Sequence, residues 1–261
     1  HLSGSYIPFG AVFVEANDVD FDGVLEMFYV PSREVEGLSV PCSVINEMGN
    51  VWAPFKGYEI LLPKFGRFGE YGMMIIGWEN TRMVDAKIIN VGGEEIRISC
   101  NGDTYYTIPI YQAKVFDVDA DGKQELVVVS TRGRMMILKP MEDKILAKSF
   151  VVGNVVDYSV CVFPDGNKIV ALVVDGRLMM IDPVELEIKL IAKGIANPRS
   201  VVISNGDLDG DGIDEIYVNT VEGVIKFSFV DGELRRAKIF EGNAMGCYTD
   251  DIDSDGMREL I

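Results

Sequence analysis

The chain has 261 residues, 48% of them hydrophobic, so it can bury a full-sized core and is not disordered. Its formal net charge of −17 argues against nucleic acid and anionic membranes as partners, because phosphate groups are bound by basic surfaces. No apolar run reaches the roughly 18 residues of a membrane-spanning helix. The cysteines Cys42, Cys100, Cys161 and Cys247 lie far apart, and we expect buried free thiols.

The first predicted strands, 11–14 and 26–30, flank an acidic stretch, DVDFDGVLE, at residues 18–26. The pattern of this stretch, D-x-D-x-D-G-x-x-E, recurs without a gap in three further places. β-like segments flank these copies too, as AKVF and ELVVV do for the second. The further copies lie at 117–125, 207–215 and 251–259. A merely solvated acidic loop would not repeat this spacing, so the pattern indicates one shared chemistry.

The spacing of these acidic residues fits a calcium-binding loop. Ca²⁺ prefers about six to eight oxygen ligands, and carboxylates at positions 1, 3 and 5 of a tight turn can converge on one ion. The glycine at position 6 permits the bend, the carbonyl of position 7 faces inward, and the glutamate at position 9 closes the shell. The predicted ligands of about four Ca²⁺ ions are Asp18, Asp20, Asp22, Val24 and Glu26; Asp117, Asp119, Asp121, Lys123 and Glu125; Asp207, Asp209, Asp211, Ile213 and Glu215; and Asp251, Asp253, Asp255, Met257 and Glu259.

These loops account for the acidity of the chain. Without their sixteen carboxylates, 25 acidic residues would face 24 lysines and arginines. The loops are not EF-hands, because an EF-hand loop has a glutamate at position 12 and a helix on each side. Here position 12 is Tyr29, Val128 or Val218, and the flanking segments are β-like. Each loop is therefore predicted to join two strands.

A repeat runs along the chain. The loops begin at residues 18, 117, 207 and 251, so the last two intervals are 90 and 44 residues, and a hidden unit is expected near 161. There, Asp165 and Gly166 take positions 5 and 6 and Ile169 takes position 9, but the other acids are missing. Another unit without ligands is expected near 64. Equivalent turn glycines follow the second strand of three units, at Gly133, Gly176 and Gly223.

The repeat predicts an all-β fold. Four strands per unit at a period of about 40–50 residues indicate the blades of a β-propeller, with the acidic loops joining the first and second strands, A and B, of a blade. We expect one domain over 1–261, with about six four-stranded blades, or seven if the native chain continues beyond Ile261. Residues 1–10 are predicted to close the last blade. The predicted blades begin near 11, 58, 111, 156, 200 and 244.

This pattern resembles the FG-GAP and VCBS calcium repeats of propellers like those of integrin alpha subunits. The first unit, FGAVFVEANDVDFDGVLEMFYVP, carries Phe9-Gly10, the whole loop and a Val30-Pro31 ending. The resemblance implies calcium at the oxygens of positions 1, 3, 5, 7 and 9 of the four loops. Propellers of this family serve adhesion, ligand recognition and complex assembly, and a minority are lectins or polysaccharide lyases.

The face opposite the acidic loops is the predicted partner-binding face. In a blade of four antiparallel strands, the A–B and C–D connections share one face, and the B–C and D–A connections share the other. The resemblance to integrin-like propellers implies that ligands bind on this second face. Its predicted residues are Arg33, Trp78, Arg82, Arg132, Asn154, Asp175, Asn197 and Glu222.

The sequence favours a binding module over an enzyme. The only histidine is His1, so the commonest general base is missing, and no nucleophile elbow, zinc motif or phosphate loop is present. We expect a non-enzymatic, calcium-stabilised module that recognises a protein or glycan partner outside the cell, where calcium is abundant. Two alternatives remain open. One is a polysaccharide lyase or another glycan-active enzyme, and the other is a lectin, for which only Trp52 and Trp78 are available as tryptophans.

Overall fold

A computed structural model describes the protein as a series of β-sheets. Every regular element within the described residues is a strand, and no helix among them is long and apolar enough to cross a membrane. Side chains are described only from Gln112 onward. The described residues are 11–17, 26–31, 43–45, 51–52, 75–78, 85–89, 98–100, 103–105, 108–109, 112–129, 133–140, 145–195, 203–230, 232–242, 247–253 and 258–261.

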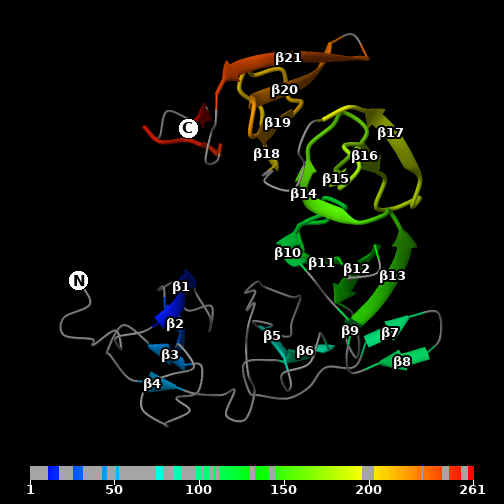
Figure 1. The fold of residues 1–261 in the computed structure, drawn as a ribbon. Helices are drawn as coiled ribbons and strands as arrows, with labels where there is room; N and C mark the ends of the chain where they lie inside the picture. The colour runs from blue at the N-terminus through cyan, green and yellow to red at the C-terminus, as the bar shows by residue number, and fades with distance from the viewer. Residues whose placement is uncertain are drawn as a thin grey trace. The chain divides into compact units, whose positions relative to one another are not determined.

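Two sheets lie in the first part of the chain (Figure 1). Strands β1 to β4 form an antiparallel sheet in chain order, and β5, β6 and β9 form a sheet of three strands. Their bounds are Ala11–Asn17 (β1), Glu26–Pro31 (β2), Ser43–Ile45 (β3), Val51–Trp52 (β4), Ile75–Trp78 (β5), Asp85–Ile89 (β6) and Ile108–Pro109 (β9).

Three longer sheets follow, each built on four strands in chain order. The first also carries a hairpin of Ile98–Cys100 (β7) and Asp103–Tyr105 (β8), which pairs with its outer strand β13. A short pair of strands ends the described chain. The bounds are Gln112–Phe116 (β10), Glu125–Val129 (β11), Arg134–Pro140 (β12) and Ile145–Val151 (β13); Val155–Cys161 (β14), Lys168–Val173 (β15), Leu178–Ile181 (β16) and Ile188–Ala192 (β17); Ile203–Gly206 (β18), Glu215–Thr220 (β19), Gly223–Val230 (β20) and Glu233–Glu241 (β21); and Thr249–Asp250 (β22) and Glu259–Leu260 (β23).

These sheets confirm the all-β prediction and the four-stranded antiparallel unit. Residues 1–10, predicted to close the last blade, lie outside the described residues. The chain divides into two compact units, one of residues 1–116, 123–131 and 136–149, and one of residues 117–122, 132–135 and 150–261.

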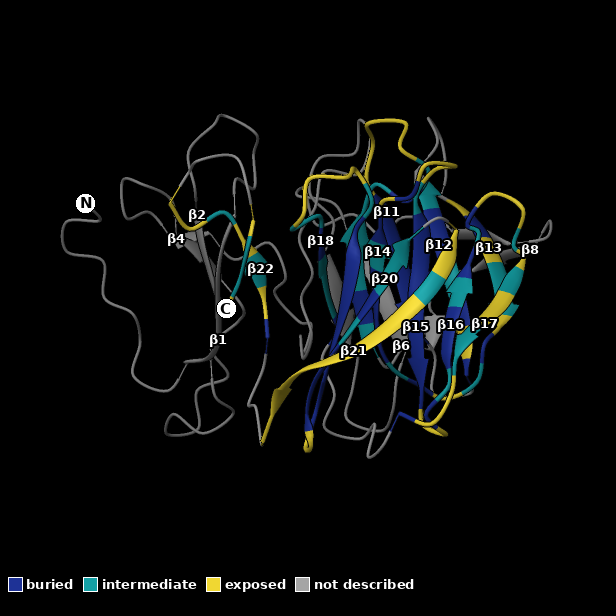
Figure 2. Ribbon diagram, turned by 90° about the horizontal axis from the view of Figure 1, so that it is seen from above, coloured by how far each residue is buried: buried dark blue, intermediate teal, exposed yellow. Residues whose placement is uncertain are grey.

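The second unit has a core between the β14–β17 sheet and the β18–β21 sheet. Every residue of β15 and of β19 is buried, which explains why their sequences, KIVALV and EIYVNT, do not alternate between apolar and polar residues. Leu172 and Leu178 of one sheet pack in the same cluster as Ile216 and Phe227 of the other. Each such side chain contributes roughly 1.5–3 kcal/mol when it leaves water. Figure 2 shows these central strands as buried.

Two of the four cysteines have described side chains, and both are buried free thiols, as expected. Burial raises the pKa of Cys161 well above its usual range, and the nearby charge of Asp214 adds to this effect. Burial also raises the pKa of Cys247, to about 11. Both groups therefore stay protonated at neutral pH and behave as small apolar side chains.

The turn glycines of the repeat are required by a close approach of the backbone. Gly176, between β15 and β16, has φ +78°, and a Cβ there would lie 2.5 Å from the carbonyl oxygen of Ile195. The amide of Ile195 donates to the carbonyl of Gly176 at 3.1 Å, so the chain leaving β17 crosses the turn directly. Gly133 repeats this arrangement with Gly153, whose carbonyl oxygen would lie 2.8 Å from an added Cβ. The shared glycine thus fixes how one sheet leads to the next.

Replacing Gly176 by alanine should lower the free energy of unfolding by about 3 kcal/mol, because the substitution adds both a steric clash and left-handed strain. Gly194→Ala is the matched control. Gly194 has a similar φ of +70° but open space around its Cβ position, so it should lose only about 1 kcal/mol. Urea unfolding of the two variants measures the difference. Equal losses would show that the contact with Ile195 is unimportant.

Candidate metal centres

The acidic loops lie at the same place in their sheets, between the first and the second strand. The loop 207–215 joins β18 to β19, and the loop 117–125 joins β10 to β11. In each case the glutamate of position 9 is the first residue of the second strand, as Glu259 is in β23 and Glu26 is in β2. Residues 18–25 and 254–257 lie outside the described residues. They include the predicted ligands Asp18, Asp20, Asp22 and Val24 of the first loop and Asp255 and Met257 of the fourth.

The first aspartate of the loop organises the turn. One carboxylate oxygen of Asp207 accepts hydrogen bonds from the amides of Gly210, at 2.7 Å, and Asp211, at 3.1 Å, and the other accepts from Gly212, at 2.8 Å. Gly212 has φ +83°, which a residue with a Cβ adopts rarely. Asp117 accepts in the same way from Asp121 and Gly122. The D-x-D-x-D-G spacing therefore folds the backbone around its own first carboxylate.

Three carboxylates of each described loop converge. Carboxylate oxygens of positions 1, 3 and 9 lie within 4.8 Å of one another in three separate groups. Glu215 and Glu259 each accept the amide of position 2 of their own loop, at 3.0 and 2.9 Å, so the two loops hold their glutamates alike. The groups are Asp117, Asp119 and Glu125; Asp207, Asp209 and Glu215; and Asp251, Asp253 and Glu259.

These groups fit a hard divalent cation. A carboxylate offers about four lone-pair sites, so oxygens that accept one amide still have capacity to coordinate a metal. An all-oxygen set suits Ca²⁺ better than Zn²⁺, whose sites in proteins are built mainly on nitrogen and sulfur ligands. The aspartate of position 5 is placed differently. In the third loop, Asp211 accepts the amide of Ile213 at 2.8 Å and is not in the group of converging oxygens.

Two of the glutamates at position 9, Glu215 and Glu125, also meet a lysine of the third strand. Glu215 has 3% of its side chain exposed, and its carboxylate lies 2.9 Å from the ammonium group of Lys226. Glu125 lies 3.9 Å from Lys139. These lysines reduce the cost of burying an anion when the loop holds no cation. Burial raises the pKa of Tyr217, close to this site, and the charges of Glu215 and Asp209 add to the shift.

The residue at position 8 of the third loop, Asp214, connects this loop to the preceding sheet. Asp214 exchanges two hydrogen bonds with Val162, which follows β14, at 2.9 and 3.0 Å. The carboxylate of Asp214 also accepts a hydrogen bond from the side-chain amide of Asn205, at 2.7 Å. The same side-chain amide donates to the carbonyl of Val160 at 2.9 Å. Asn167, immediately before β15, donates to the carbonyl of Asp117 at 2.7 Å. A loop that holds its shape therefore also holds the neighbouring sheet.

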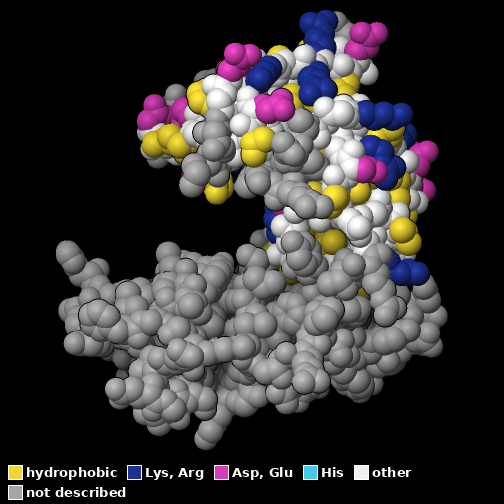
Figure 3. Space-filling model, viewed as in Figure 1, with side chains coloured by type: hydrophobic (Ala, Val, Ile, Leu, Met, Phe, Trp, Pro, Cys, Tyr) yellow, Lys and Arg dark blue, Asp and Glu magenta, His cyan; other side chains and the backbone are white. Residues whose placement is uncertain are grey.

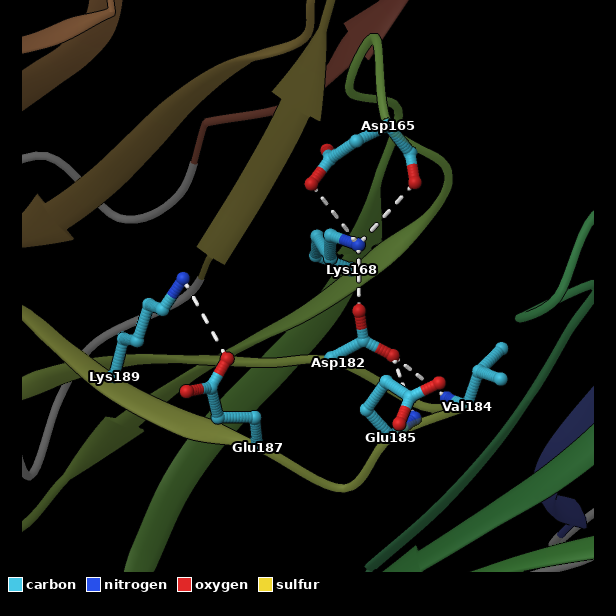
Figure 4. A network of polar contacts seen from close by, with 7 residues as sticks. All are labelled: Asp165, Lys168, Asp182, Val184, Glu185, Glu187 and Lys189. Carbon is cyan, nitrogen blue, oxygen red and sulfur yellow. Dashed lines mark hydrogen bonds and ion pairs between the residues drawn. The ribbon is translucent and has the colours of Figure 1, made fainter.

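The loop between β14 and β15 has an internal cation in place of a metal site (Figure 4). The ladder pairs Cys161 with Lys168 as it pairs Gly206 with Glu215, so Lys168 stands where the other loops have glutamate. The sequence alignment that put Ile169 at position 9 was therefore wrong, because this loop is two residues shorter. The ammonium group of Lys168 lies 2.7 Å from Asp182 and 3.4 Å from Asp165.

The charge of Lys168 stabilises an ionised neighbour. Burial opposes the charged form of Lys168, but the hydrogen bond and charge of Asp182, with help from Asp165, raise its pKa. The hydrogen bond from Lys168 lowers the pKa of Asp182 to about 2, and the backbone amides of Glu185 and Val184 contribute. The pair is charged over the whole physiological range of pH.

The stability contributed by Asp182 should disappear in acid. Its folded pKa of about 2 lies below the unfolded value, so the contribution is complete above about pH 4 and is lost as pH falls towards 2. Asp182→Asn keeps the oxygen that accepts from Val184 and Glu185, at 2.8 and 2.9 Å, and removes only the charge. Urea unfolding should show the variant about 1 kcal/mol less stable at pH 7 and equal to the wild type near pH 2. A constant difference across this range would contradict the assignment.

The predicted partner face has few described side chains. Asp175, in the β15–β16 turn, bonds to the guanidinium of Arg177 at 2.7 Å. The carbonyl of Glu222 accepts from Gly242, and that of Asn154 accepts from Val174. The structure does not describe the side chain of Trp78, and Arg33, Arg82, Arg132 and Asn197 lie outside the described residues.

A cavity of about 430 Å³ lies instead beside the third acidic loop. Phe163 and Phe229 form one wall, with their rings edge to face at 5.1 Å between centroids, and Asp211 reaches the rim. Pro164, Ile213, Val230 and Gly232 complete the lining. Sequence reasoning missed this hollow because it is assembled from three separate connections.

Sequence reasoning also missed Lys168 and Asp214, although a charged residue at the start of an apolar strand was a visible signal for both.

Comparison with solved structures identifies the fold. BBS1N, crystallised in complex with ARL6DN, matches 100% of this chain over 76% of its own length, with a TM-score of 0.58 and 14% identity. The WD40 domain of SCAP from fission yeast matches 92% of this chain over 58% of its own length, with a TM-score of 0.55 and 14% identity. The chain has a β-propeller fold. No protein-family model and no curated protein sequence matched it, so membership of the FG-GAP and VCBS repeats stays a prediction for this propeller.

Proposed function

We propose that this propeller is a calcium-stabilised, non-enzymatic module that recognises a protein or glycan partner outside the cell. The observation that carries the proposal is the convergence of three carboxylates, within 4.8 Å, at one equivalent place in three sheets. One ion in each loop would replace mutual repulsion by coordination. Millimolar extracellular calcium suits loops of this kind.

Calcium would have a structural role in this arrangement. The first and ninth residues of the third loop, Asp207 and Glu215, hold backbone amides of the loop itself, and Asp214 holds the preceding sheet. Fixing the loop therefore fixes the contact between two blades. This supports a rigid scaffold whose connecting turns vary from blade to blade, which is a common way to carry binding specificity.

The calcium content of the chain tests the first half of the proposal. Metal analysis after dialysis against low free calcium should give about four Ca²⁺ ions per chain, three for the described groups and one for the first loop. Asp209→Ala should remove one ion, because it deletes a converging carboxylate, whereas Asp175→Ala should remove none. A content near zero, or an unchanged content in Asp209→Ala, would contradict the assignment.

The binding half is tested with the same preparations. The immobilised chain should retain a protein or glycan partner from a panel of extracellular ligands without chemically altering it. Substituting Arg82 or Arg132, the sequence-based candidates on the face opposite the loops, should weaken retention without changing the melting temperature. Asp209→Ala should do the reverse at saturating calcium. Cleavage of a polysaccharide by the chain would replace this proposal with the lyase alternative.

A further inference from the structure

The outermost strand β21 of the β18–β21 sheet has a long free edge. It spans nine residues, Glu233–Glu241, and is the longest strand of the described chain. It ends the order of strands in its sheet, and within the described residues no strand pairs with its outer side. Every residue except Leu234 is exposed, as Figure 2 shows. Such an edge presents backbone donors and acceptors that can pair with a further strand.

The composition of β21 suits a partner strand. It contains no proline, and its single irregularity lies near the end, where the ladder passes from Lys238 to Phe240, so residues 233–238 pair without a break with β20. Ile239 and Phe240 have 44% and 51% of their surface exposed. An accessible strand of this length is an unusual feature unless something covers it, because open edges invite pairing.

The charge of β21 is opposite to that of the chain. Its three exposed basic residues are Arg235, Arg236 and Lys238, and its two acidic residues are Glu233 and Glu241, so its net charge is +1 (3 − 2) in a chain with a net charge of −17. The ammonium group of Lys238 lies 3.6 Å from Glu241. Arg236 also lies over the ring of Phe227, with 5.9 Å between its Cζ and the ring centroid, so its guanidinium is held near the strand. Figure 3 shows lysine and arginine side chains, with Asp and Glu side chains among them, over the part of the surface that carries β21.

A second copy of this chain does not fit the edge. In the antiparallel register that pairs all nine residues of two β21 strands, Glu233 would oppose Glu241, and Arg236 would oppose Lys238. Like charges directly opposite each other destabilise a pair of strands. The edge is therefore complementary to an acidic strand rather than to itself.

This protein already extends one blade in the same way. The outer strand β13 of the β10–β13 sheet pairs in parallel with β7, through Ile145–Ala147 and Ile98–Cys100. The added strand comes from outside the four-stranded unit and lengthens the sheet at its outer edge. An outer strand of this fold thus accepts a further strand without disturbing the blade.

We propose that β21 binds an extended acidic peptide segment of a partner protein, which adds to the sheet as a further strand. Backbone hydrogen bonds along 233–238 supply the affinity, and the basic side chains select acidic sequences. This surface is separate from the face opposite the acidic loops, so the inference does not depend on the partner proposed for that face.

A fluorescent peptide of alternating glutamate and valine is the probe, and its anisotropy is measured with the 261-residue chain at saturating calcium. The peptide should bind, and the double variant Arg235→Glu/Lys238→Glu should weaken binding at least about tenfold. Lys189→Glu, on the shorter outer strand β17, is the matched control and should have little effect. Methylating the backbone nitrogens of one alternate set of peptide residues should abolish binding, while methylating the other set should not, because only one set faces β21.

Three outcomes would overturn the proposal. The first is no binding at a peptide concentration of about 1 mM, which is the weakest affinity of interest. The second is equal binding of the two methylated peptides, which would exclude strand addition. The third is binding that Asp209→Ala abolishes and Arg235→Glu/Lys238→Glu leaves unchanged, which would place the peptide on a loop calcium. A failure of the proposed partner face would leave all three measurements unaffected.

Discussion

Removing calcium should lower the melting temperature of this propeller by about 20 °C or more. Each ion stabilises the folded chain by about 2.7 kcal/mol at a hundredfold excess over its dissociation constant, and four sites together contribute about 11 kcal/mol. That sum is comparable with the whole stability of an ordinary domain. In a chain of this size, each 1 kcal/mol corresponds to about 2–4 °C. Scanning calorimetry with calcium and with excess chelator measures the shift.

The structure makes this effect cooperative between blades. If the third loop lost a bound ion, Asp207, Asp209 and Glu215 would repel one another, and the contact of Asp214 with Val162 would be strained with them. Restoring calcium should restore the melting temperature, and magnesium should do so poorly because it demands a tighter octahedral shell. Asp175→Asn, on the opposite side of the blade, should respond to chelator like the wild type. A melting curve indifferent to chelator would exclude structural calcium.

The acidic loops were predictable because their geometry is local. Position 1 collects the amides of its own turn, and the glycine of position 6 takes the positive φ, so nine consecutive residues contain the information. The strands on each side were equally visible, since apolar runs such as ELVVV bound the loops. The all-β fold and its four-stranded sheets followed from the regular spacing of these units.

Interactions between blades could not be read from the sequence. The cavity beside Asp211 joins connections that are far apart in the chain, namely those around Phe163, Ile213 and Phe229. The hydrogen bond between Asp214 and Val162 joins residues that are 52 positions apart in the sequence. Only the register of the strands reveals that the residue at position 8 of this loop faces the preceding sheet. In the same way, the sequence alignment did not allow for the shorter β14–β15 loop, so it placed Ile169 at position 9 instead of Lys168.

The β14–β15 loop has an internal ion pair where the other loops have converging carboxylates. The loop lacks the acids of positions 1 and 3, and the glutamate is replaced by Lys168, which reverses the charge at the start of the second strand. Asp182, which follows the third strand β16, is the anionic partner of Lys168. In the β10–β13 sheet the charges are reversed, because Lys139 of the third strand is the cationic partner of Glu125. The covalently attached ammonium group lies against Asp165 of the loop as well as Asp182, and it needs no supply from solution.

Lys168→Met should therefore lower the free energy of unfolding by about 3 kcal/mol, because it leaves Asp182 without its buried partner. Adding Asp182→Asn should recover part of the loss, since the double variant has no unpaired charge at this point. The loss in Lys168→Met should be the same at saturating and at limiting calcium, when measured by urea unfolding. Asp209→Ala, in contrast, should be destabilising at saturating calcium and nearly neutral once calcium is removed. If the effect of Lys168→Met changed with calcium as that of Asp209→Ala does, the lysine would not be acting as an internal substitute for the ion.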